Sequence, residues 1–465
     1  MSADPMPRQR SYSRRKVHLV SKKAQPQSSR TRWRRRALSA VPGAALLVAL
    51  VLGLALLFSA CGGGGSDGGG EDSVTLGMTS DLFPALKAPI ARWGKEHGVK
   101  VTIREMPADT GAYFDQMRTM LQAGSGEVDL FAGDVSWPAQ FGSNGWLADV
   151  SAAFTPAERK AYFPAFVQAN EWEGKLYGFP FFTDVGLLYY RKDLLAKAGF
   201  TKPPETWDEL KEMAKTVMAE DPTIEDGFTF TGARYEGGTL LGTEFIETSG
   251  GSVIDGEAVE VDQPPAVEGL ETQRSMVTSG VSPAAVANYE EGDAEAPFLA
   301  GRSVFLRNWA YVFGDIANPE LSEIKPSQVG VTSVPRASTQ IPPVNVGGGW
   351  NLYVNAYSSN QQVAIELAKF ISSEAQQKHT AETIGYLPTR KAVYNDQSLI
   401  ESQPAIAQGK TEISQTVTPP KSPYYADMSA VMAEQFNKSL SGASSPADAA
   451  EAVQSGLESI INRGG

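Results

Sequence analysis

The stretch Gly178–Leu194, GFPFFTDVGLLYYRKDL, decides the fold. It opens with an aromatic run that carries one acid, Asp184, and continues into apolar and aromatic residues that predict a buried strand over Val185–Tyr190. A charged turn, Arg191–Asp193, then leads into a predicted helix. Asp184 therefore stands where the chain passes between elements, as either a capping acid of a turn or an acid that binds a ligand.

Predicted strands and helices alternate on both sides of this stretch. Before it, strands are predicted over Val74–Met78, Val99–Met106 and Val128–Phe131, with helices over Phe83–His97 and Tyr113–Ala123. After it, Thr206–Glu220 is predicted as a helix, because Thr206 and Glu209 have the spacing of a capping box. Further strands are predicted over Ser303–Leu306 and Val329–Val334, and a further helix over Gln361–Ser372. This alternation predicts an α/β fold, in which ligands bind beyond the carboxyl ends of the strands.

The first sixty residues have the pattern of an export signal. Residues 1–36 contain twelve Lys and Arg and one acid, and an uncharged apolar run, Ala37–Phe58, follows. The only cysteine, Cys61, comes directly after this run and precedes a Gly/Ser stretch. Residues 1–60 therefore resemble a bacterial lipoprotein signal peptide. We expect Cys61 to be lipidated and residues 61–71 to form a flexible tether. An uncleaved membrane helix is the alternative, and Arg34–Arg36 leave general and twin-arginine export open.

The charge of the mature chain limits its partners. The full chain has 41 basic and 53 acidic residues; without residues 1–60 it has 29 and 52, a net charge of −23. Such a chain does not suit nucleic acid or an anionic membrane surface. With a single cysteine it has no internal disulfide, so its roughly 400 residues depend on hydrophobic cores, and two domains are expected.

Five motifs in order along the chain suggest a family. They are DVSWPAQF at 134–141, GFPFFTDVGLLYYRKDLL at 178–195, RYEGG at 234–238, RNWAY at 307–311 and GGGWNLYV at 347–354. Together they resemble the family 1 extracellular solute-binding proteins of ABC sugar importers, in particular the trehalose/maltose-binding branch. The resemblance covers essentially all of residues 72–465.

The resemblance implies a two-lobe, periplasmic-binding-protein-like clamp of the class II type, with a cleft between the lobes. Residues 72–182 plus 330–385 would form lobe one, and residues 184–328 plus 386–465 lobe two. The protein would be a monomer, anchored by its lipid on the extracellular face of the cell membrane. It would bind a disaccharide such as trehalose or maltose, close around it, and deliver it to the transmembrane subunits of an ABC permease.

A disaccharide offers hydroxyl groups and apolar faces, so its site needs carboxylates, hydrogen-bond donors and aromatic rings. The residues that the resemblance assigns to this site are Asp81, Asp134, Asp184, Trp309, Tyr311, Gly348, Gly349, Trp350 and Arg390. The acids would accept hydrogen bonds from hydroxyls, the aromatic residues would stack on the sugar, and Arg390 would donate at the hinge. The two glycines would let the backbone approach the sugar, since no Cβ intervenes.

Each assignment has a structural alternative. Asp134 could cap the next helix, and Trp309 and Tyr311 could be core aromatics. The glycines are also compatible with a strand bulge, and Arg390 with a surface arginine. Tyr113 departs from the family pattern, because related trehalose-binding proteins tend to carry a basic donor there.

Two other classes of protein compete with a binder. Asp134 and Asp184 could be the paired carboxylates of a secreted glycoside hydrolase, and the chain could also bind a different sugar or small solute. The three histidines, His18, His97 and His379, are scattered, and no phosphate-binding glycine loop occurs. We therefore expect neither catalysis nor a metal or cofactor. A tethered scaffold is disfavoured, because acids and aromatic residues gather in loops at strand ends.

Overall fold

The computed structural model of the chain describes residues 72–256 and 258–464. The expected signal peptide, Cys61 and the tether therefore lie outside the described residues. Within the described part, no helix has both the length and the apolar character needed to cross a bilayer.

The first sheet combines strands from distant parts of the sequence. Its strands are β1 (Asp72–Met78), β2 (Val99–Glu105), β3 (Leu130–Asp134), β6 (Gly178–Val185), β13 (Asn345–Val354), β14 (Leu387–Pro388) and β15 (Thr416–Val417). Their order is β14-β6-β13-β3-β1-β2, with β15 paired to β13. β1 runs parallel to β2 and β3, whereas β13 runs antiparallel to both β3 and β6. The sheet is therefore mixed, and the carboxyl end of β3, at Asp134, lies opposite Trp350 in the middle of β13.

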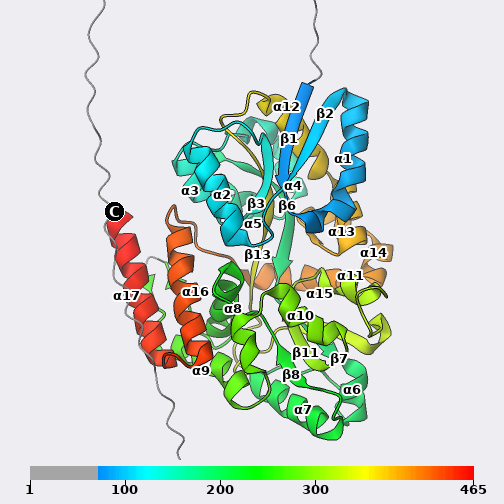
Figure 1. Cartoon of the computed structure of the whole chain (residues 1–465), viewed down its shortest axis with the longest axis vertical. Coiled ribbons are helices and arrows are strands. Elements are labelled where there is room, and N and C mark those ends of the chain that lie inside the picture. Colours follow the sequence, from blue (N-terminus) through cyan, green and yellow to red (C-terminus); the bar gives the residue numbers. More distant parts are fainter. Residues whose placement is uncertain (1–71, 257, 465) are drawn as a thin grey trace, which may run out of the picture. The chain divides into compact units, whose positions relative to one another are not determined.

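Helices cover both faces of this sheet (Figure 1). They are α1 (Phe83–His97), α2 (Thr110–Gln122), α3 (Trp137–Ser143), α4 (Pro156–Ala161), α5 (Pro164–Ala169), α12 (Gln361–Ile371) and α13 (Glu374–Ile384). Leu86 of α1 and Leu367 of α12 share one apolar core with Leu76 of β1. The aromatic residues of α2 and α3 form a second core with Phe131 and Tyr353. The apolar face of α1 is thus buried against the sheet.

The second sheet has four strands, β7 (Leu187–Arg191), β8 (Asp226–Thr229), β11 (Ser303–Asn308) and β12 (Val329–Ser333), in the order β12-β7-β11-β8. Two short pairs, β4 (Glu171–Trp172) with β5 (Lys175–Leu176) and β9 (Ile254–Asp255) with β10 (Ala258–Val259), stand apart. The other helices are α6 (Lys192–Lys197), α7 (Trp207–Glu220), α8 (Glu236–Glu247), α9 (Pro264–Thr278), α10 (Glu291–Leu299), α11 (Val312–Ala317), α14 (Gln397–Ser402), α15 (Pro404–Glu412), α16 (Tyr425–Ser441) and α17 (Pro446–Gly464).

Local sequence signals explain several of these elements. The Thr206 side chain accepts from the Glu209 backbone while Glu209 reaches back to the Thr206 backbone, so the predicted capping box at α7 is confirmed. The α/β prediction is confirmed as well. The α16–α17 pair packs its apolar faces on Ile246 of α8 and Leu270 of α9.

The chain passes from the first sheet to the second at Gly186, between β6 and β7. The strand predicted over Val185–Tyr190 is confirmed as β7, but β7 begins at Leu187, because Gly186 separates two strands of different sheets. A Cβ at Gly186 would lie 2.1 Å from an oxygen of Glu244. Only glycine fits this crossing without displacing that carboxylate.

The pairing also differs from the expected lobe bounds. Asp184, expected in lobe two, belongs to β6 and lies opposite Gly348 in the first sheet. β12, which contains the expected boundary at residue 330, pairs with β7 along its whole length in the second sheet. β14, expected in lobe two, pairs with β6. The chain thus returns to the first sheet in the segment between β12 and β13.

Candidate ligand-binding cleft

A cavity of about 760 Å³ is lined by residues attached to both sheets. Asp81, in the turn after β1, and Trp350, on β13, line it from the first sheet, and Trp309 and Tyr311 line it from the end of β11. Asp184 lies beside the crossing at Gly186. These five are the predicted site residues that the structure brings together around one cavity.

Aromatic rings form one wall of this cavity. The rings of Phe182 and Tyr386 stack with centroids 4.2 Å apart and an interplanar angle of 13°. Trp350 lies nearly parallel to Phe182, 6.5 Å away, and Tyr311 meets Tyr386 edge to face at 6.0 Å. Such flat, apolar surfaces suit the C–H faces of a sugar ring.

Carboxylates form the polar part of the lining. Those lining the cavity are Asp81, Asp109, Asp184, Glu290, Glu291 and Asp315. Among the described residues that line it, none is a lysine, arginine or histidine. Because ionised carboxylates only accept hydrogen bonds, the cavity calls for a ligand rich in hydrogen-bond donors.

Asp184 is the least satisfied of these acids. Its Oδ1 is buried and has no hydrogen-bond partner among the described residues. Burial, with further repulsion from Glu291, raises the pKa of Asp184 to about 7, although Arg307 opposes that rise. Because this acceptor without a partner stands beside the cavity, it can take a hydrogen bond from a donor of the ligand.

Neighbouring side chains hold two of the other acids in place. The Tyr386 hydroxyl donates to Asp81 Oδ2 at 2.5 Å. Glu291 accepts from the Tyr235 hydroxyl and, at 3.3 Å, from Trp309 Nε1. Burial raises the pKa of Tyr386 well above its usual value, with the charge of Asp81 adding to the rise, so this hydroxyl stays a donor.

Sequence reasoning missed Tyr386, Tyr235 and Glu291. Tyr235 stands in the RYEGG motif, and Tyr386 stands four residues before Arg390. An aromatic hydroxyl within a family motif was a signal for Tyr235. Tyr386 lies outside the five motifs, and Glu291 lies in an acidic run, Glu290–Asp293, without any distinguishing pattern.

Asp134 lies behind the wall of the cleft. Its Oδ1 accepts from the backbone N–H of Ser136 at 2.8 Å and from the Ser136 hydroxyl at 2.6 Å, just before α3 begins. Burial raises the pKa of Asp134, and the Ser136 hydrogen bonds oppose that rise. Asp134 does not line the cavity in the described part of the chain. Its hydrogen bonds form a local turn ahead of Ser136, which is itself the N-cap of α3, so Asp134 is not the helix cap either.

Gly348 and Gly349 are buried under the same wall. Gly349 has φ of 130°, and a Cβ there would come within 2.6 Å of the Phe182 carbonyl oxygen. The Thr183 hydroxyl donates to the Gly348 carbonyl at 3.1 Å. The glycines thus allow β13 to lie close to β6 and leave the indole of Trp350 as the group that reaches the cavity.

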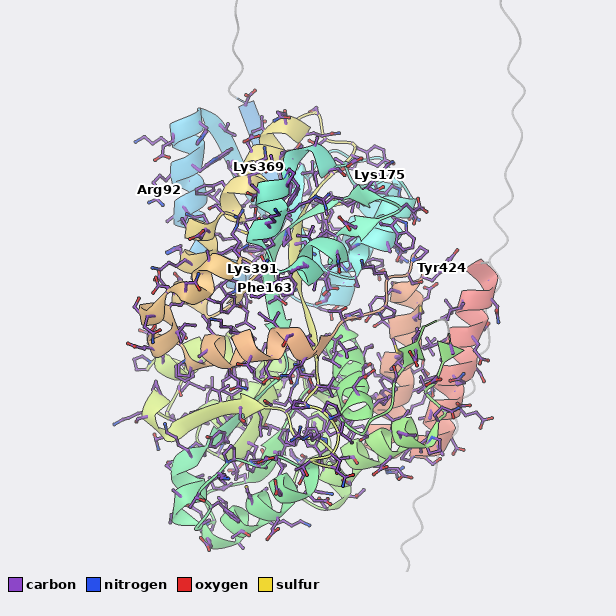
Figure 2. The ribbon with its side chains drawn as sticks, turned by 180° about the vertical axis from the view of Figure 1, so that it is seen from behind. Arg92, Phe163, Lys175, Lys369, Lys391 and Tyr424 are labelled. Atoms are coloured by element: carbon purple, nitrogen blue, oxygen red, sulfur yellow. The ribbon has the colours of Figure 1, made fainter. Side chains whose placement is uncertain are left out.

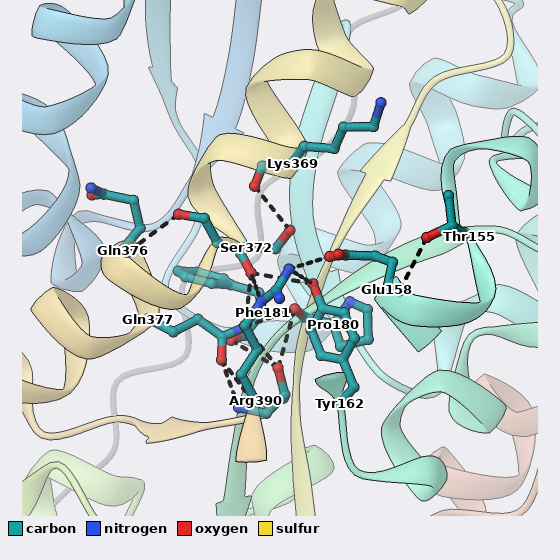
Figure 3. A network of polar contacts seen from close by, with 12 residues as sticks. Thr155, Glu158, Tyr162, Pro180, Phe181, Lys369, Ser372, Gln376, Gln377 and Arg390 are labelled. Atoms are coloured by element: carbon teal, nitrogen blue, oxygen red, sulfur yellow. Dashed lines mark hydrogen bonds and ion pairs between the residues drawn. The ribbon is translucent and has the colours of Figure 1, made fainter. Parts of the chain in front are cut away.

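Arg390 is not in the cleft, which corrects its expected role. Figure 3 shows its guanidinium among Glu158, Tyr162 and Ser372. It forms an ion pair with Glu158, donates to the Ser372 carbonyl at 2.6 Å and donates to the Tyr162 hydroxyl at 2.8 Å. Its side chain is 11% exposed, and these contacts use its Nε and Nη2 donors. Figure 2 shows the neighbouring Lys391 beside Phe163 on the face opposite that of Figure 1.

Tyr113, where a basic donor was expected, is a core residue. Its side chain is fully buried, and its hydroxyl donates to the Gly77 carbonyl at 3.1 Å. Its ring lies 5.7 Å from that of Trp350. It therefore supports the aromatic wall from behind and contributes no positive charge to the cleft.

A second cavity of about 670 Å³ adjoins the first and shares Asp109, Thr110 and Tyr235 with it. Its lining includes Arg234 and Glu236. Burial raises the pKa of Glu236 to about 7, with further repulsion from Asp134. The cleft therefore continues past Tyr235 towards α16.

Comparisons with known proteins agree with this geometry. Residues 79–378 match the family described as bacterial extracellular solute-binding protein. A Deinococcus radiodurans protein named "Probable ABC transporter-binding protein" is 33% identical over 428 residues, covering 90% of this chain and 99% of its own. Maltose-bound MalE3 of T. maritima is 32% identical in sequence, with a TM-score of 0.79, covering 83% of this chain and 99% of its own.

The two-lobe α/β fold of the clamp proteins is thereby confirmed. The chain belongs to the bacterial extracellular solute-binding protein family of ABC transporters. That family and these relatives are binding proteins rather than enzymes. Within the described residues, no group of three or more His, Cys, Asp or Glu is arranged to hold a metal ion.

Proposed function

We propose that this protein binds a sugar of disaccharide size, such as maltose or trehalose, in the cleft between its two sheets and delivers it to an ABC permease. The observation that carries the proposal is the lining of the first cavity. Among the described residues, carboxylates and stacked aromatic rings line the same cavity, and no cationic side chain lines it. Sugar hydroxyls would donate to the carboxylates, and sugar C–H faces would pack on the rings.

The relatives support a carbohydrate ligand. MalE3 of T. maritima, at 32% identity, was solved with maltose bound. A Bacillus subtilis relative, 24% identical over 326 residues, is named galactooligosaccharide-binding protein. The preferred sugar is therefore to be determined by measuring binding.

The cleft favours binding over hydrolysis. A glycoside hydrolase needs two carboxyl groups facing one bond. Asp134, the expected partner of Asp184, is turned to Ser136 behind the wall. Two of the other acids, Asp81 and Glu291, accept hydrogen bonds from Tyr386, Tyr235 and Trp309, an arrangement suited to holding a ligand in place.

We further propose that the mature chain begins at a lipidated Cys61 and stays on the extracellular face of the cell membrane as a monomer. The apolar run before the only cysteine carries this part of the proposal. Replacement of Cys61 by Ser should leave the protein unprocessed or released. Unchanged cleavage and membrane retention of the variant would refute the lipid anchor.

The function is tested by thermal unfolding of the mature protein with maltose, trehalose, sucrose and glucose. A ligand at a hundredfold excess over its Kd stabilises the folded state by about 2.7 kcal/mol. Maltose or trehalose should raise the unfolding temperature in the wild type, much less so in Asp184→Ala, and be recovered intact after incubation. No shift with any of the four sugars would overturn the disaccharide proposal, and steady release of glucose would favour the hydrolase.

A further inference from the structure

A completely buried ion pair lies at the junction of the two sheets, next to the cleft. Arg307 of β11 donates from Nε to Glu244 Oε1 at 2.7 Å and from Nη2 to Glu244 Oε2 at 2.6 Å. Both side chains are 1% exposed. Neither lines the cavity, so this pair has no part in direct ligand contact.

The pair also holds the backbone of the strand that returns to the first sheet. Arg307 Nη2 donates to the Val346 carbonyl at 3.2 Å, and the Val346 N–H donates to Glu244 Oε2 at 3.1 Å. Val346 is the second residue of β13, two residues before Gly348, which lies opposite Asp184. One ion pair from α8 and β11 thus fixes both polar groups of a peptide segment in the other sheet.

The same arginine supports a ring of the cleft. Its guanidinium carbon lies 4.0 Å from the ring centroid of Trp309, a cation–π contact. Trp309 also packs with Leu240 and Val346 in a small apolar cluster. Arg307 therefore sits beneath the indole that lines the cavity, while Glu291 fixes the indole N–H.

We propose that the Arg307–Glu244 pair is a positioning element that orients Trp309 and the start of β13, and so sets the affinity of the cleft for its ligand without contacting it. This inference rests on the proposed function of the cleft. Glu244 holds the guanidinium in one orientation. In that orientation the guanidinium both donates to the backbone of β13 and stacks on the indole of Trp309.

The pair also influences Asp184 by its charge. The groups whose charges act on Asp184 are Glu291 of α10, Arg307 of β11, Asp134 of β3 and Asp81 of the turn after β1. Arg307 is the only cation among them, and it lowers the pKa of Asp184 while the three acids raise it. Removal of the guanidinium should therefore move the titration of Asp184 to higher pH.

Three variants test the proposal. The double variant Arg307→Met with Glu244→Leu replaces the buried pair by apolar groups of similar size, a change that proteins often tolerate without loss of stability. Arg307→Lys keeps the charge but loses the fork. Arg191→Lys is the matched control, because Arg191 makes the same two-bond contact with Asp193 on the second sheet, away from the cleft.

The first measurement uses the protein without sugar. The unfolding temperature is measured from pH 4 to pH 8 in each protein and in the same protein with Asp184→Asn. The pH-dependent change that disappears with Asp184→Asn reports the titration of Asp184. The double variant should shift this midpoint upward, whereas both lysine variants should keep it near that of the wild type.

The second measurement is the Kd for maltose of the folded proteins at pH 8. The double variant should bind about tenfold more weakly, because Trp309 and the start of β13 lose the group that orients them. Arg307→Lys should be weakened less, and Arg191→Lys should match the wild type. If the Arg307 variants keep both the wild-type midpoint and the wild-type Kd, or lose stability alone, the pair is merely structural and the inference is overturned. If the midpoint shifts but even the wild type binds no maltose, the charge effect of Arg307 on Asp184 stands, whereas the proposed ligand fails.

Discussion

Two groups of polar side chains differ in how far the protein itself satisfies their hydrogen bonds. In the Arg390 cluster the guanidinium donates to a carboxylate, a carbonyl and a hydroxyl of the protein itself (Figure 3). In the cleft, Asp184 Oδ1 is buried without a partner among the described residues. A satisfied network stabilises the fold, whereas an unsatisfied acceptor beside a cavity keeps its bonding capacity for a ligand. The difference separates residues that hold the lobe together from residues that bind.

The largest expected effect is on stability, from Arg390→Met. The substitution leaves Glu158 without its ion-pair partner and removes one of the hydrogen bonds to the Ser372 carbonyl, and hydrogen bonds to charged groups contribute about 1.5–3 kcal/mol each. We expect the free energy of unfolding in urea to fall by about 3 kcal/mol with an unchanged maltose Kd. Lys369→Met, which removes an exposed pair with Glu366, is the control and should change little. A weaker Kd with intact stability would place Arg390 among the binding residues after all.

The next effect is on affinity, from Asp184→Ala. Loss of a charged acceptor should weaken sugar binding by about 1.5–3 kcal/mol at pH 8, measured by titration calorimetry. Stability without sugar should not fall, because the carboxylate lacks a partner in the free protein. An unfolded variant would show instead that Asp184 is a packing residue.

The third effect is a pH dependence of binding. The pKa of Asp184 is raised to about 7 by burial, and the ionised form is the better acceptor. Maltose affinity should therefore rise roughly tenfold from pH 6 to pH 8 in the wild type and stay flat in Asp184→Asn. In the free protein the sign is opposite: a carboxyl whose pKa is raised on folding stabilises at low pH, and this contribution is lost as the pH rises from about 4 to about 7. A flat wild-type profile in both measurements would contradict the buried acid.

The smallest effect is expected from Trp309→Leu. Leucine can still pack on Leu240 and Val346, so the protein should fold with little change in unfolding temperature. The lost aromatic contact should weaken binding by about 0.5–1.5 kcal/mol beyond the lost area, and the sugar-induced change in tryptophan fluorescence should shrink. Unaltered affinity would make Trp309 a core residue only.

Periodicity and motifs predicted the alternation of helices and strands well. In α1, α7 and the early strands one face is buried, and the spacing of apolar residues in the sequence matches that face. They did not show that Gly186 divides the strand after Asp184, since the two halves are equally apolar and only the pairing with β13 or β11 separates them. In the site, acids and rings within motifs were found. Arg390 was misplaced because its partner Glu158 is distant in sequence, and Tyr386 was missed because only the fold brings it to Asp81.

The place of β13 affects the order in which the chain can fold. β13 lies between β3 and β6, although all four strands of the second sheet stand between β6 and β13 in the sequence. The first sheet therefore cannot close until residues 345–354 are available, and pairing over such separations is slow. In a chain made from its amino terminus, every strand of the second sheet exists before the central strand of the first. The late central strand thus leaves the first sheet as the last to close.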